Sequence, residues 1–471
     1  MKDLNRRDFL KIAGTATATA TLAACAGKTG LEIGDTDPAG HHTGAIPTDK
    51  MTYRTNPNTG DKVSILGYGM MRLPNKPVAP TKDPSAPPVE EIDQEQVNKL
   101  VKYALDHGVN YFDTSPAYCR GYSEESTGIA LKASGYDRSK YYIATKLSNF
   151  APQQQTYEES VKIFQNSLKY LQTDYIDYLL LHAVGGGGWE NLNQRFLKNG
   201  VLDYLMEQRK KGVIRNLGFS FHGDVEVFDY LLANQDTYHW DFVQIQMNFL
   251  DWRHASMRGG RRSDADAEYL YGKCEKLGIQ NVVMEPLRGG AFGRMAQELT
   301  DQLKAVHPDD STARWAFRWV GSHNNILTTL SGMNRMDHLE DNIRTFSPLD
   351  PCTEQENRLL AEIADQMSGI PTIPCTACEY CMPCPYGVDI PGNFAAYNEA
   401  VNTHLLPLPH KEAADYAERQ QAFIDEYRKA LPDDKKWASR CQDCEVCLSK
   451  CPQQIRIPNQ MARIVETLRK R

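Results

Sequence analysis

Short apolar runs alternate with amphipathic stretches over nearly 300 residues of this 471-residue chain, and this alternation limits the fold more than any other feature. Eight runs have a strand-like pattern, over residues 62–69, 109–115, 140–147, 175–182, 214–222, 242–249, 281–287 and 325–333. Helical patterns follow them, and several end at a glycine, which helix C-termini favour. Eight β-then-α units predict an α/β fold, the closed (β/α)8 TIM barrel. A doubly wound open sheet is the alternative, but no GxGxxG pattern begins the first unit.

Eight of the twelve cysteines lie in the last hundred residues, in the runs CTACEYCMPCP and CQDCEVCLSKCP. Three thiolates spaced two residues apart can bind three corners of an iron-sulfur cube, while the cysteine before proline ligates the other cluster. The pattern predicts two 4Fe-4S clusters, one held by Cys375, Cys378, Cys381 and Cys451, and the other by Cys441, Cys444, Cys447 and Cys384. The first run is one residue shorter before its last cysteine, so the exchange of ligands is less regular there.

Zinc and disulfides are the alternatives for these cysteines. Zinc sites use paired CxxC knuckles around one tetrahedral ion and do not need four cysteines and a trailing proline in both runs. Cysteines this close in sequence pair poorly as disulfides. The segment instead resembles a bacterial dicluster ferredoxin, which implies an α-helical iron-sulfur domain over residues 351–471. Cys119, Cys274 and Cys352 are read as ordinary packed or surface residues.

The N-terminal segment has the order of an export signal. Arg6 and Arg7 precede a mildly apolar Ala/Thr stretch that is too short to span a bilayer, and the stretch ends in Leu-Ala-Ala-Cys at Cys25. Residues 1–25 therefore resemble a twin-arginine signal with a lipobox, and residues 26–52 read as a flexible linker before a barrel over residues 53–350. This predicts a periplasmic protein or a lipoprotein anchored at Cys25. A cytoplasmic protein with a chance arginine pair is the alternative.

Charge argues against one class of partner. The chain has 53 basic and 60 acidic residues, a net charge of −7, and no long run of a single sign. Nucleic-acid binding requires a basic surface, so no nucleic acid is expected as a partner.

Four polar side chains fall at or just after the C-terminal ends of predicted strands, where a barrel carries its reactive residues. They are Asp113, Tyr118, Lys146 and His182. Each alone also has a structural explanation, as a turn cap, a packed aromatic or a solvated strand end. A lysine beside a tyrosine favours the phenolate, and a paired aspartate keeps that lysine charged, so Tyr118 is predicted to act as general acid or base. His182 is predicted to orient a carbonyl oxygen.

The same region carries the motifs FDTSPAY, SEESTGIAL, ATKL, SLKYLQTDYIDYLLLH, GVIRNLGFS, EPLRGG and SGMNRMDHLEDN. On these motifs, residues 55–346 resemble the aldo/keto reductase family, and the whole chain resembles its ferredoxin-fused branch. The resemblance implies that the four residues form a catalytic tetrad with Tyr118 as proton donor. It also implies a nicotinamide coenzyme across the rim, contacted by Ser220, Gln246, Glu285, Pro286, Leu287 and the segment from Gly332 to Asn342.

Arg335 in the last of these segments has the shape and charge to bind a 2′-phosphate, which favours NADP(H). One departure concerns Phe221, which stands where many family members have asparagine after the serine, so one contact to the nicotinamide is missing. Nicotinamide transfers a hydride whereas each cluster takes one electron, so a relay between them calls for a splitter such as a flavin. No flavin motif is evident in the sequence.

Two functions remain open at this level. The first is an oxidoreductase for a small carbonyl or alcohol, with electrons passing through the clusters to or from a redox partner protein or electron carrier. The second is an electron-transfer or scaffold protein whose barrel is catalytically idle. Twin-arginine export carries folded proteins, which agrees with clusters assembled in the cytoplasm. Residues 410–431 form an amphipathic helical stretch, expected to pack against the barrel or to bind a partner.

Overall fold

The computed structural model describes residues 44–77, 90–255, 265–406 and 414–469. Internal contacts divide the chain after Gly34 into two units, and every described residue belongs to the second unit, Asp35–Arg471. Arg6, Arg7 and Cys25 of the predicted export signal lie outside the described residues, as does most of the predicted linker. Within the described ranges, no helix combines the length and the apolar character needed to cross a membrane.

Eight parallel strands close into a barrel, as the alternating sequence pattern predicts. Each strand pairs with its neighbours in chain order, and the barrel closes where Thr329 pairs with Leu66. The strands are β3 (Leu66–Gly69), β6 (Tyr111–Asp113), β7 (Tyr142–Leu147), β8 (Ile176–Val184), β9 (Ile214–Phe221), β10 (Phe242–Gln246), β11 (Gln280–Met284) and β12 (Ile326–Ser331). The TIM-barrel prediction is confirmed.

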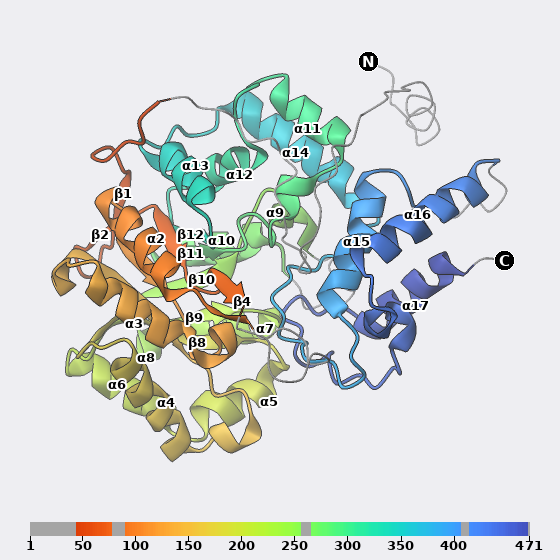
Figure 1. Ribbon diagram of the computed structural model, residues 1–471. Helices are drawn as coiled ribbons and strands as arrows, with labels where there is room; N and C mark the ends of the chain where they lie inside the picture. The colour runs from red at the N-terminus through yellow and green to blue at the C-terminus, as the bar shows by residue number, and fades with distance from the viewer. Residues whose placement is uncertain (1–43, 78–89, 256–264, 407–413, 470–471) are drawn as a thin grey trace. The chain divides into compact units, whose positions relative to one another are not determined.

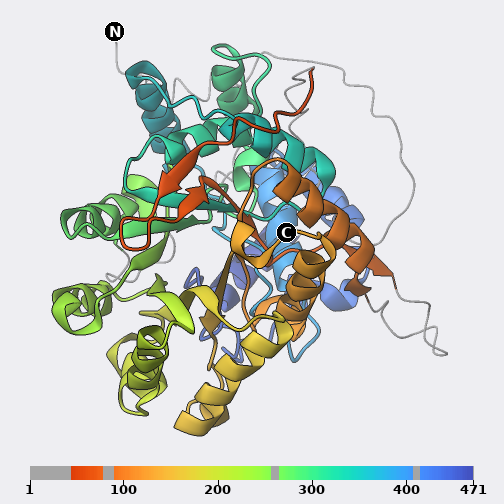
Figure 2. The same ribbon diagram turned by 90° about the vertical axis from the view of Figure 1, so that its left-hand side faces the viewer.

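Helices surround these strands, as Figures 1 and 2 show. The longer ones alternate buried apolar residues with polar residues at helical spacing, so each covers the strands with one face. They are α2 (Gln94–Asp106), α3 (Ser123–Ala133), α4 (Tyr157–Tyr170), α6 (Val201–Lys210), α7 (Val225–Ala233), α10 (Ala267–Lys276), α11 (Gln297–Lys304), α12 (Thr312–Gly321) and α13 (Met336–Phe346). Shorter helices lie in the connections, namely α5 (Gly188–Leu192), α8 (Gln235–Tyr238) and α9 (Asp251–His254).

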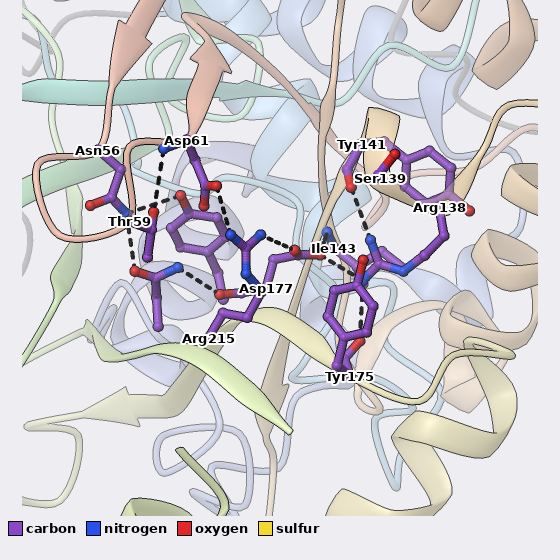
Figure 3. Close-up of polar contacts among 12 residues, drawn as sticks. Asn56, Thr59, Asp61, Arg138, Ser139, Tyr141, Ile143, Tyr175, Asp177 and Arg215 are labelled. Carbon is purple, nitrogen blue, oxygen red and sulfur yellow. Dashed lines mark hydrogen bonds and ion pairs between the residues drawn. The ribbon is translucent and has the colours of Figure 1, made fainter. Parts of the chain in front are cut away.

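A hairpin of β1 (Tyr53–Thr55) and β2 (Lys62–Ser64) precedes the barrel, and its polar side chains bond to residues at the amino-terminal ends of the strands. Asn56 donates to the Tyr178 hydroxyl at 3.1 Å, and Asp61 pairs with Arg215 at 2.8 Å. Figure 3 shows this network continuing through Asp177 to Arg138. Polar networks at this end of a barrel usually serve stability, because reactive groups gather at the other end. A second hairpin joins β4 (Asn75–Pro77) and β5 (Glu90–Ile92).

The helix after the barrel, α14 (Glu354–Ser368), follows the predicted domain boundary at residue 350 but packs with the barrel. Its Leu360, Ile363 and Ala364 are buried in the same apolar core as the barrel helices. A Thr353–Glu356 capping box begins the helix, in which the Thr353 hydroxyl accepts from the Glu356 amide and the Glu356 carboxylate accepts from the Thr353 amide. The buried residues that form a second apolar core, separate from that of the barrel, begin at Ile373.

The second core is built from three helices, α15 (Ile390–Asn402), α16 (Tyr416–Ala430) and α17 (Ile457–Leu468), which contact one another. Phe394, Phe423 and Tyr427 are buried there, beside the cysteine runs. Residues 410–431 were expected to pack against the barrel or to bind a partner. The described part of this stretch is mostly α16, whose apolar face packs against α15 and α17 instead.

Candidate functional site

Three neighbouring strands bring the four predicted reactive residues together at their carboxyl ends. Asp113 ends β6, Lys146 lies one residue before the end of β7, and His182 lies near the end of β8. Tyr118 begins η1 (Tyr118–Gly121), a short 3-10 turn after β6. All four are buried, with exposed fractions between 1% and 8%.

Lys146 and Asp113 form the ionic centre of this group. The Lys146 ammonium donates to both carboxylate oxygens of Asp113, at 2.6 and 2.8 Å, and to the carbonyl of Thr114 at 2.9 Å. Its three protons are therefore all used. Burial raises the pKa of Asp113 and lowers that of Lys146, while their mutual attraction opposes both shifts and favours the charged pair.

Tyr118 lies over this ion pair, with the Lys146 nitrogen 4.8 Å from its ring centroid. Burial raises the pKa of Tyr118 well above its usual value, and the negative charge of Asp113 adds to the shift. The Lys146 ammonium protons are directed to Asp113 and Thr114, so Lys146 acts on Tyr118 through its charge and not through a hydrogen bond. Tyr118 therefore keeps its proton at neutral pH, which is the state that a proton donor requires.

His182 is held by hydroxyl groups on one side and lies against Tyr118 on another. Its Nδ1 is 2.6 Å from the Ser148 Oγ and 3.3 Å from the Ser115 Oγ, so Nε2 is the nitrogen left for a substrate. The Tyr118 and His182 rings meet edge to face, with centroids 5.9 Å apart. Burial lowers the pKa of His182 well below its usual value, and the nearby Lys146 and Arg195 charges lower it further. A neutral imidazole beside a protonated phenol can bind one carbonyl oxygen.

The residues predicted to contact a nicotinamide coenzyme lie on the other half of the rim. Ser220 is in β9, Gln246 ends β10, Glu285, Pro286 and Leu287 follow β11, and Gly332 follows β12. Arg335 caps α13, and Asn342 lies within that helix. The structure therefore places this set along one continuous edge, next to the tetrad strands. Phe221, the departure from the family pattern, is buried against Phe228 with ring centroids 4.9 Å apart.

Several of these side chains already have partners within the chain. The Gln246 amide donates to Asp251 at 2.9 Å and exchanges hydrogen bonds of 3.2 and 3.3 Å with Gln453 of the iron-sulfur domain. Arg335 binds the Asp337 carboxylate with two nitrogens, and its side chain is 51% exposed. The set fits a nicotinamide coenzyme only in part, because Gln453 covers the Gln246 contact. NADP(H) stays a prediction from the resemblance.

The eight cysteines of the two runs fall into two groups in space, and each group draws on both runs. The first cysteine set is Cys375, Cys378, Cys381 and Cys451. Burial, with a smaller contribution from the neighbouring Cys378 and Cys451 thiols, raises the pKa of Cys375 to about 12. Thiols that resist ionisation alone become good ligands when a cationic metal core compensates their charge.

The second cysteine set is Cys384, Cys441, Cys444 and Cys447. These residues line one hollow, which Cys381 also reaches. Burial, with smaller contributions from Cys441, Cys444 and Cys384, raises the pKa of Cys447 to about 11. Cys444 is exposed to solvent. The grouping has the crossed arrangement that the sequence predicts, in which the cysteine before each proline joins the other run.

The backbone repeats around the two sets in a way that the cysteine spacing alone does not indicate. Ala377 and Glu379 in the first run have φ of 50° and 63°, and their counterparts Asp443 and Glu445 have 51° and 60°. Such turns point successive backbone amides inward, a geometry found at anion and iron-sulfur sites. The Ala377 amide, for instance, donates to the Cys375 sulfur at 3.4 Å. Each run then leads into a helix with proline in its first turn, α15 or α17.

A buried hydroxyl supports the same fit. Thr376, next to Cys375, is 1% exposed, and its Oγ has no hydrogen-bond partner among the described residues. Buried polar groups are nearly always bonded, so a partner that the chain itself does not supply is expected here. A cluster sulfur accepts such bonds. Among the described residues, no three or more His, Cys, Asp or Glu side chains converge closely enough for a single ion, whereas a cube spaces its ligands more widely.

Two groups at this site were not predicted from the sequence. Ser148 and Ser115 hold the His182 ring, but a serine after a strand carries no signal of its own. Tyr380, between Cys378 and Cys381, lies against Phe150 with ring centroids 6.5 Å apart. Only the packing of the iron-sulfur domain on the barrel rim brings it there.

Three family models match the chain. Residues 65–365 match the aldo/keto reductase family, residues 374–456 match a 4Fe-4S dicluster domain, and residues 3–23 match the twin-arginine translocation signal sequence. The first match covers the barrel and most of α14. The second covers both cysteine sets.

Relatives and solved structures agree with the first match. The chain is 24% identical to L-galactose dehydrogenase of Arabidopsis thaliana over 318 residues, which is 64% of this chain and 90% of that protein. It is 36% identical to glyoxal reductase of Bacillus subtilis over 228 residues, 48% of this chain and 70% of that one. An aldo-keto reductase of Bacillus halodurans shares the fold, with a TM-score of 0.50 and 22% identity over 66% of this chain and 96% of its own. One of Klebsiella pneumoniae in complex with NADPH has a TM-score of 0.50 and 20% identity over 67% and 96%. The chain belongs to the aldo/keto reductase family and carries a C-terminal 4Fe-4S dicluster domain.

Proposed function

We propose that this oxidoreductase interconverts a small carbonyl compound and its alcohol, with Tyr118 as proton donor and two 4Fe-4S clusters as the store of electrons. The observation that carries the proposal is the buried group of Asp113, Tyr118, Lys146 and His182 at one end of the barrel. An idle barrel would have no need to bury an ion pair under a protonated phenol, because burying charge is costly.

The side chains divide the chemistry between them. Neutral His182 donates from Nε2 to the carbonyl oxygen and orients it toward the Tyr118 hydroxyl. Tyr118 transfers its proton to that oxygen as the bond order falls. The Lys146 charge, 4.8 Å from the Tyr118 ring centroid, stabilises the phenolate that remains. Asp113 keeps Lys146 charged in its buried position.

A carbonyl and its alcohol differ by two electrons and two protons. Tyr118 supplies the proton on oxygen, and NADP(H), held by the residues along the other half of the rim, would supply the hydride that carbon receives. The two cysteine sets would hold clusters that exchange the same two electrons in single steps with the coenzyme and with a partner.

The two cysteine sets differ in exposure to solvent, and this difference suggests which set would exchange electrons with the barrel and which with an external partner. The first set includes Cys378 and Cys381, on either side of Tyr380, which lies against the barrel. The second set includes exposed Cys444, with Val446 beside it 44% exposed, so a redox partner protein or electron carrier would exchange electrons there.

The relatives suggest the substrate class. L-galactose dehydrogenase and D-arabinose 1-dehydrogenase are named for sugars, and glyoxal reductase for a small dicarbonyl. We propose a small aldose or a short hydroxylated carbonyl compound as substrate. The twin-arginine match supports export by that route, and we propose that the protein acts in the periplasm or at a membrane through a lipid on Cys25.

Tyr118→Phe tests the proposal. Protein prepared without oxygen and loaded with clusters is mixed with reduced methyl viologen, NADP⁺ and L-galactose, D-arabinose or glyoxal in turn, and viologen oxidation is followed by absorbance. We expect the wild type to oxidise viologen with at least one compound and Tyr118→Phe to be slower by about 10²–10⁴-fold, the usual contribution of a general acid. Equal rates for the two proteins, or no turnover by the wild type with any compound, would overturn the proposal.

A further inference from the structure

The loop from Cys375 to Cys381 is fastened to the barrel rim at two places. Arg72, which follows β3, donates a hydrogen bond to the carbonyl of Thr376. On another part of the rim, Gly289 packs against the same residue so closely that a Cβ at position 289 would lie 2.5 Å from the Thr376 Cα. Gly289 also has φ of 67°, so glycine is required there on both counts. The loop therefore has a defined position on the rim.

A third contact fastens the chain segment that supplies Cys451, the member of the first cysteine set that comes from the second run. Gln453, two residues after Cys451, is 3% exposed and exchanges hydrogen bonds with Gln246 at the end of β10. Both chain segments that supply the first set are thus bonded to the rim where the reactive residues lie. Among the described residues, no contact of this kind joins Cys441, Cys444 or Cys447 to the barrel.

The position of Tyr380 follows from this docking. Its ring lies 6.5 Å from the Phe150 ring, and the Phe150 ring lies 4.9 Å from His182, which meets Tyr118. Tyr380 therefore stands in one series of ring contacts with Phe150, His182 and Tyr118, the last two of which would bind a carbonyl oxygen.

We propose that Tyr380 contacts the substrate, so that the iron-sulfur domain supplies one wall of the reaction site. The inference rests on the proposed function and deepens it. Tyr380 stands between two ligands of the first cysteine set, so the segment that would hold the first cluster also supplies a wall of the substrate site.

A plain packing role is the competing explanation, in which Tyr380 only seals the two domains together. The two explanations differ in what the phenol hydroxyl does. A seal requires the ring, whereas a substrate contact also uses the hydroxyl, which can bond to a second oxygen of a hydroxylated substrate. Tyr380→Phe keeps the ring and removes the hydroxyl, and Tyr380→Ala removes both.

The experiment compares these two variants with the wild type and with Tyr170→Leu, a matched change of a tyrosine that is 39% exposed on α4. Each protein is prepared without oxygen, its iron and labile sulfide are measured, and KM and kcat are determined for the best compound of the viologen assay. We expect iron content to be equal, KM to rise on the order of 10-fold in Tyr380→Phe and further in Tyr380→Ala, and Tyr170→Leu to match the wild type.

A spectroscopic readout accompanies the kinetics. The proteins are reduced with dithionite, and electron paramagnetic resonance spectra are recorded with and without the same compound. We expect the compound to change the cluster signal of the wild type and not that of Tyr380→Ala. Unchanged KM in both Tyr380 variants, with Tyr118→Phe inactive, would overturn this inference alone. An unaffected Tyr118→Phe would overturn the proposed function as well. A Tyr380→Ala protein that loses its clusters leaves Tyr380→Phe to decide.

Discussion

Ser148 leaves Nε2 as the nitrogen of His182 that would face a substrate, because its hydroxyl lies 2.6 Å from Nδ1. The sequence places this serine two residues after Lys146, so the same strand end supplies a member of the ion pair and the support of the imidazole. Arg195 completes the support, since it donates to the carbonyl of His182 at 2.7 Å. A single histidine at a strand end thus depends on neighbours from three separate segments.

Ser148→Ala should weaken catalysis without abolishing it. The change removes the shorter of two hydrogen bonds to Nδ1 and leaves Ser115 at 3.3 Å, so the ring is less firmly oriented. One such bond is worth about 1 kcal/mol, which corresponds to a fall in kcat/KM of about 5-fold. The viologen assay measures it, with the fall expected mainly in kcat. Ser148→Thr retains a hydroxyl and should recover most of the activity. Equal loss in both variants would contradict the orienting role.

Glu124 gives the barrel a stability that depends on pH. It is 2% exposed on α3, accepts a bond from Thr145 at 2.5 Å, and burial raises its pKa to about 7. A carboxyl whose pKa is higher in the folded state than in the unfolded state stabilises the fold at pH values below its unfolded-state pKa, which is near 4.5. This contribution is lost as the pH rises through the folded-state pKa of about 7. The shift corresponds to about 3 kcal/mol.

Glu124→Gln should remove this pH dependence, because the amide resembles the protonated acid. We expect the variant to be more stable than the wild type at pH 8 and similar to it near pH 5, by guanidinium chloride unfolding of protein kept without oxygen. Glu125→Gln, at the exposed neighbouring position, is the control and should follow the wild type at both pH values. A wild-type advantage at pH 8 would show that the carboxylate is stabilising.

At the scale of elements, Asp177 at the start of β8 connects three neighbouring strands at the amino-terminal end of the barrel (Figure 3). Its carboxylate accepts from the backbone amide of Ile143 in β7 at 2.9 Å. It also pairs with Arg215 of β9 at 2.9 Å and with Arg138 before β7 at 2.6 Å. The carboxylate is almost fully buried while both arginines reach solvent in part. This end of the barrel serves stability, and the tetrad lies at the other end.

Asp177→Asn should destabilise the barrel and leave the chemistry intact. The amide keeps one acceptor oxygen but loses the charge that two arginines share, at a cost of about 1–3 kcal/mol, discounted because the arginines are partly exposed. Guanidinium chloride unfolding should show a lower midpoint, with KM unchanged. Asp174→Asn, at a nearby exposed position, should have neither effect. A changed KM with an unchanged midpoint would refute the assignment.

For the whole molecule, the crossing of the two cysteine runs joins segments that lie about sixty residues apart in sequence into one domain. The apolar core of that domain is small, with three helices and a few large aromatic side chains, and the cysteines lie against it. Small domains of this kind commonly draw folding energy from their metal sites. We therefore expect each cluster to stabilise the domain as well as to carry electrons.

Paired serine substitutions test the crossed ligand assignment by iron and labile sulfide content. Cys384→Ser and Cys444→Ser should each lose about half of the iron, and the double variant no more than either alone, because both residues belong to one set. Cys384→Ser combined with Cys378→Ser should lose nearly all of it, because the two belong to different sets. The reverse pattern would mean that each run ligates its own cluster. Cys352→Ser, outside both runs, is the control.

Much of the site could be predicted from the sequence because its residues stand at strand ends. Asp113, Lys146 and His182 end consecutive parallel strands, which must meet at one rim once the barrel closes. Ser148 and Arg195 could not be predicted, because their contacts depend on side-chain packing that no local pattern records. The partners of the three Lys146 protons could not be predicted either, since they depend on the packing of Asp113 and Thr114 around the ammonium group.

The sequence by itself determined the barrel and the two cysteine runs, because both are encoded in short-range spacing: the period of apolar residues and the interval between thiols. Only the tertiary structure decided how the iron-sulfur domain meets the barrel. The contacts that fasten it, such as Gln246 with Gln453, join residues 207 positions apart, and neither glutamine has a neighbour in sequence that indicates its partner. Such pairs form when two already folded surfaces fit together, so the position of Tyr380 beside the tetrad follows from shape and hydrogen bonding in three dimensions.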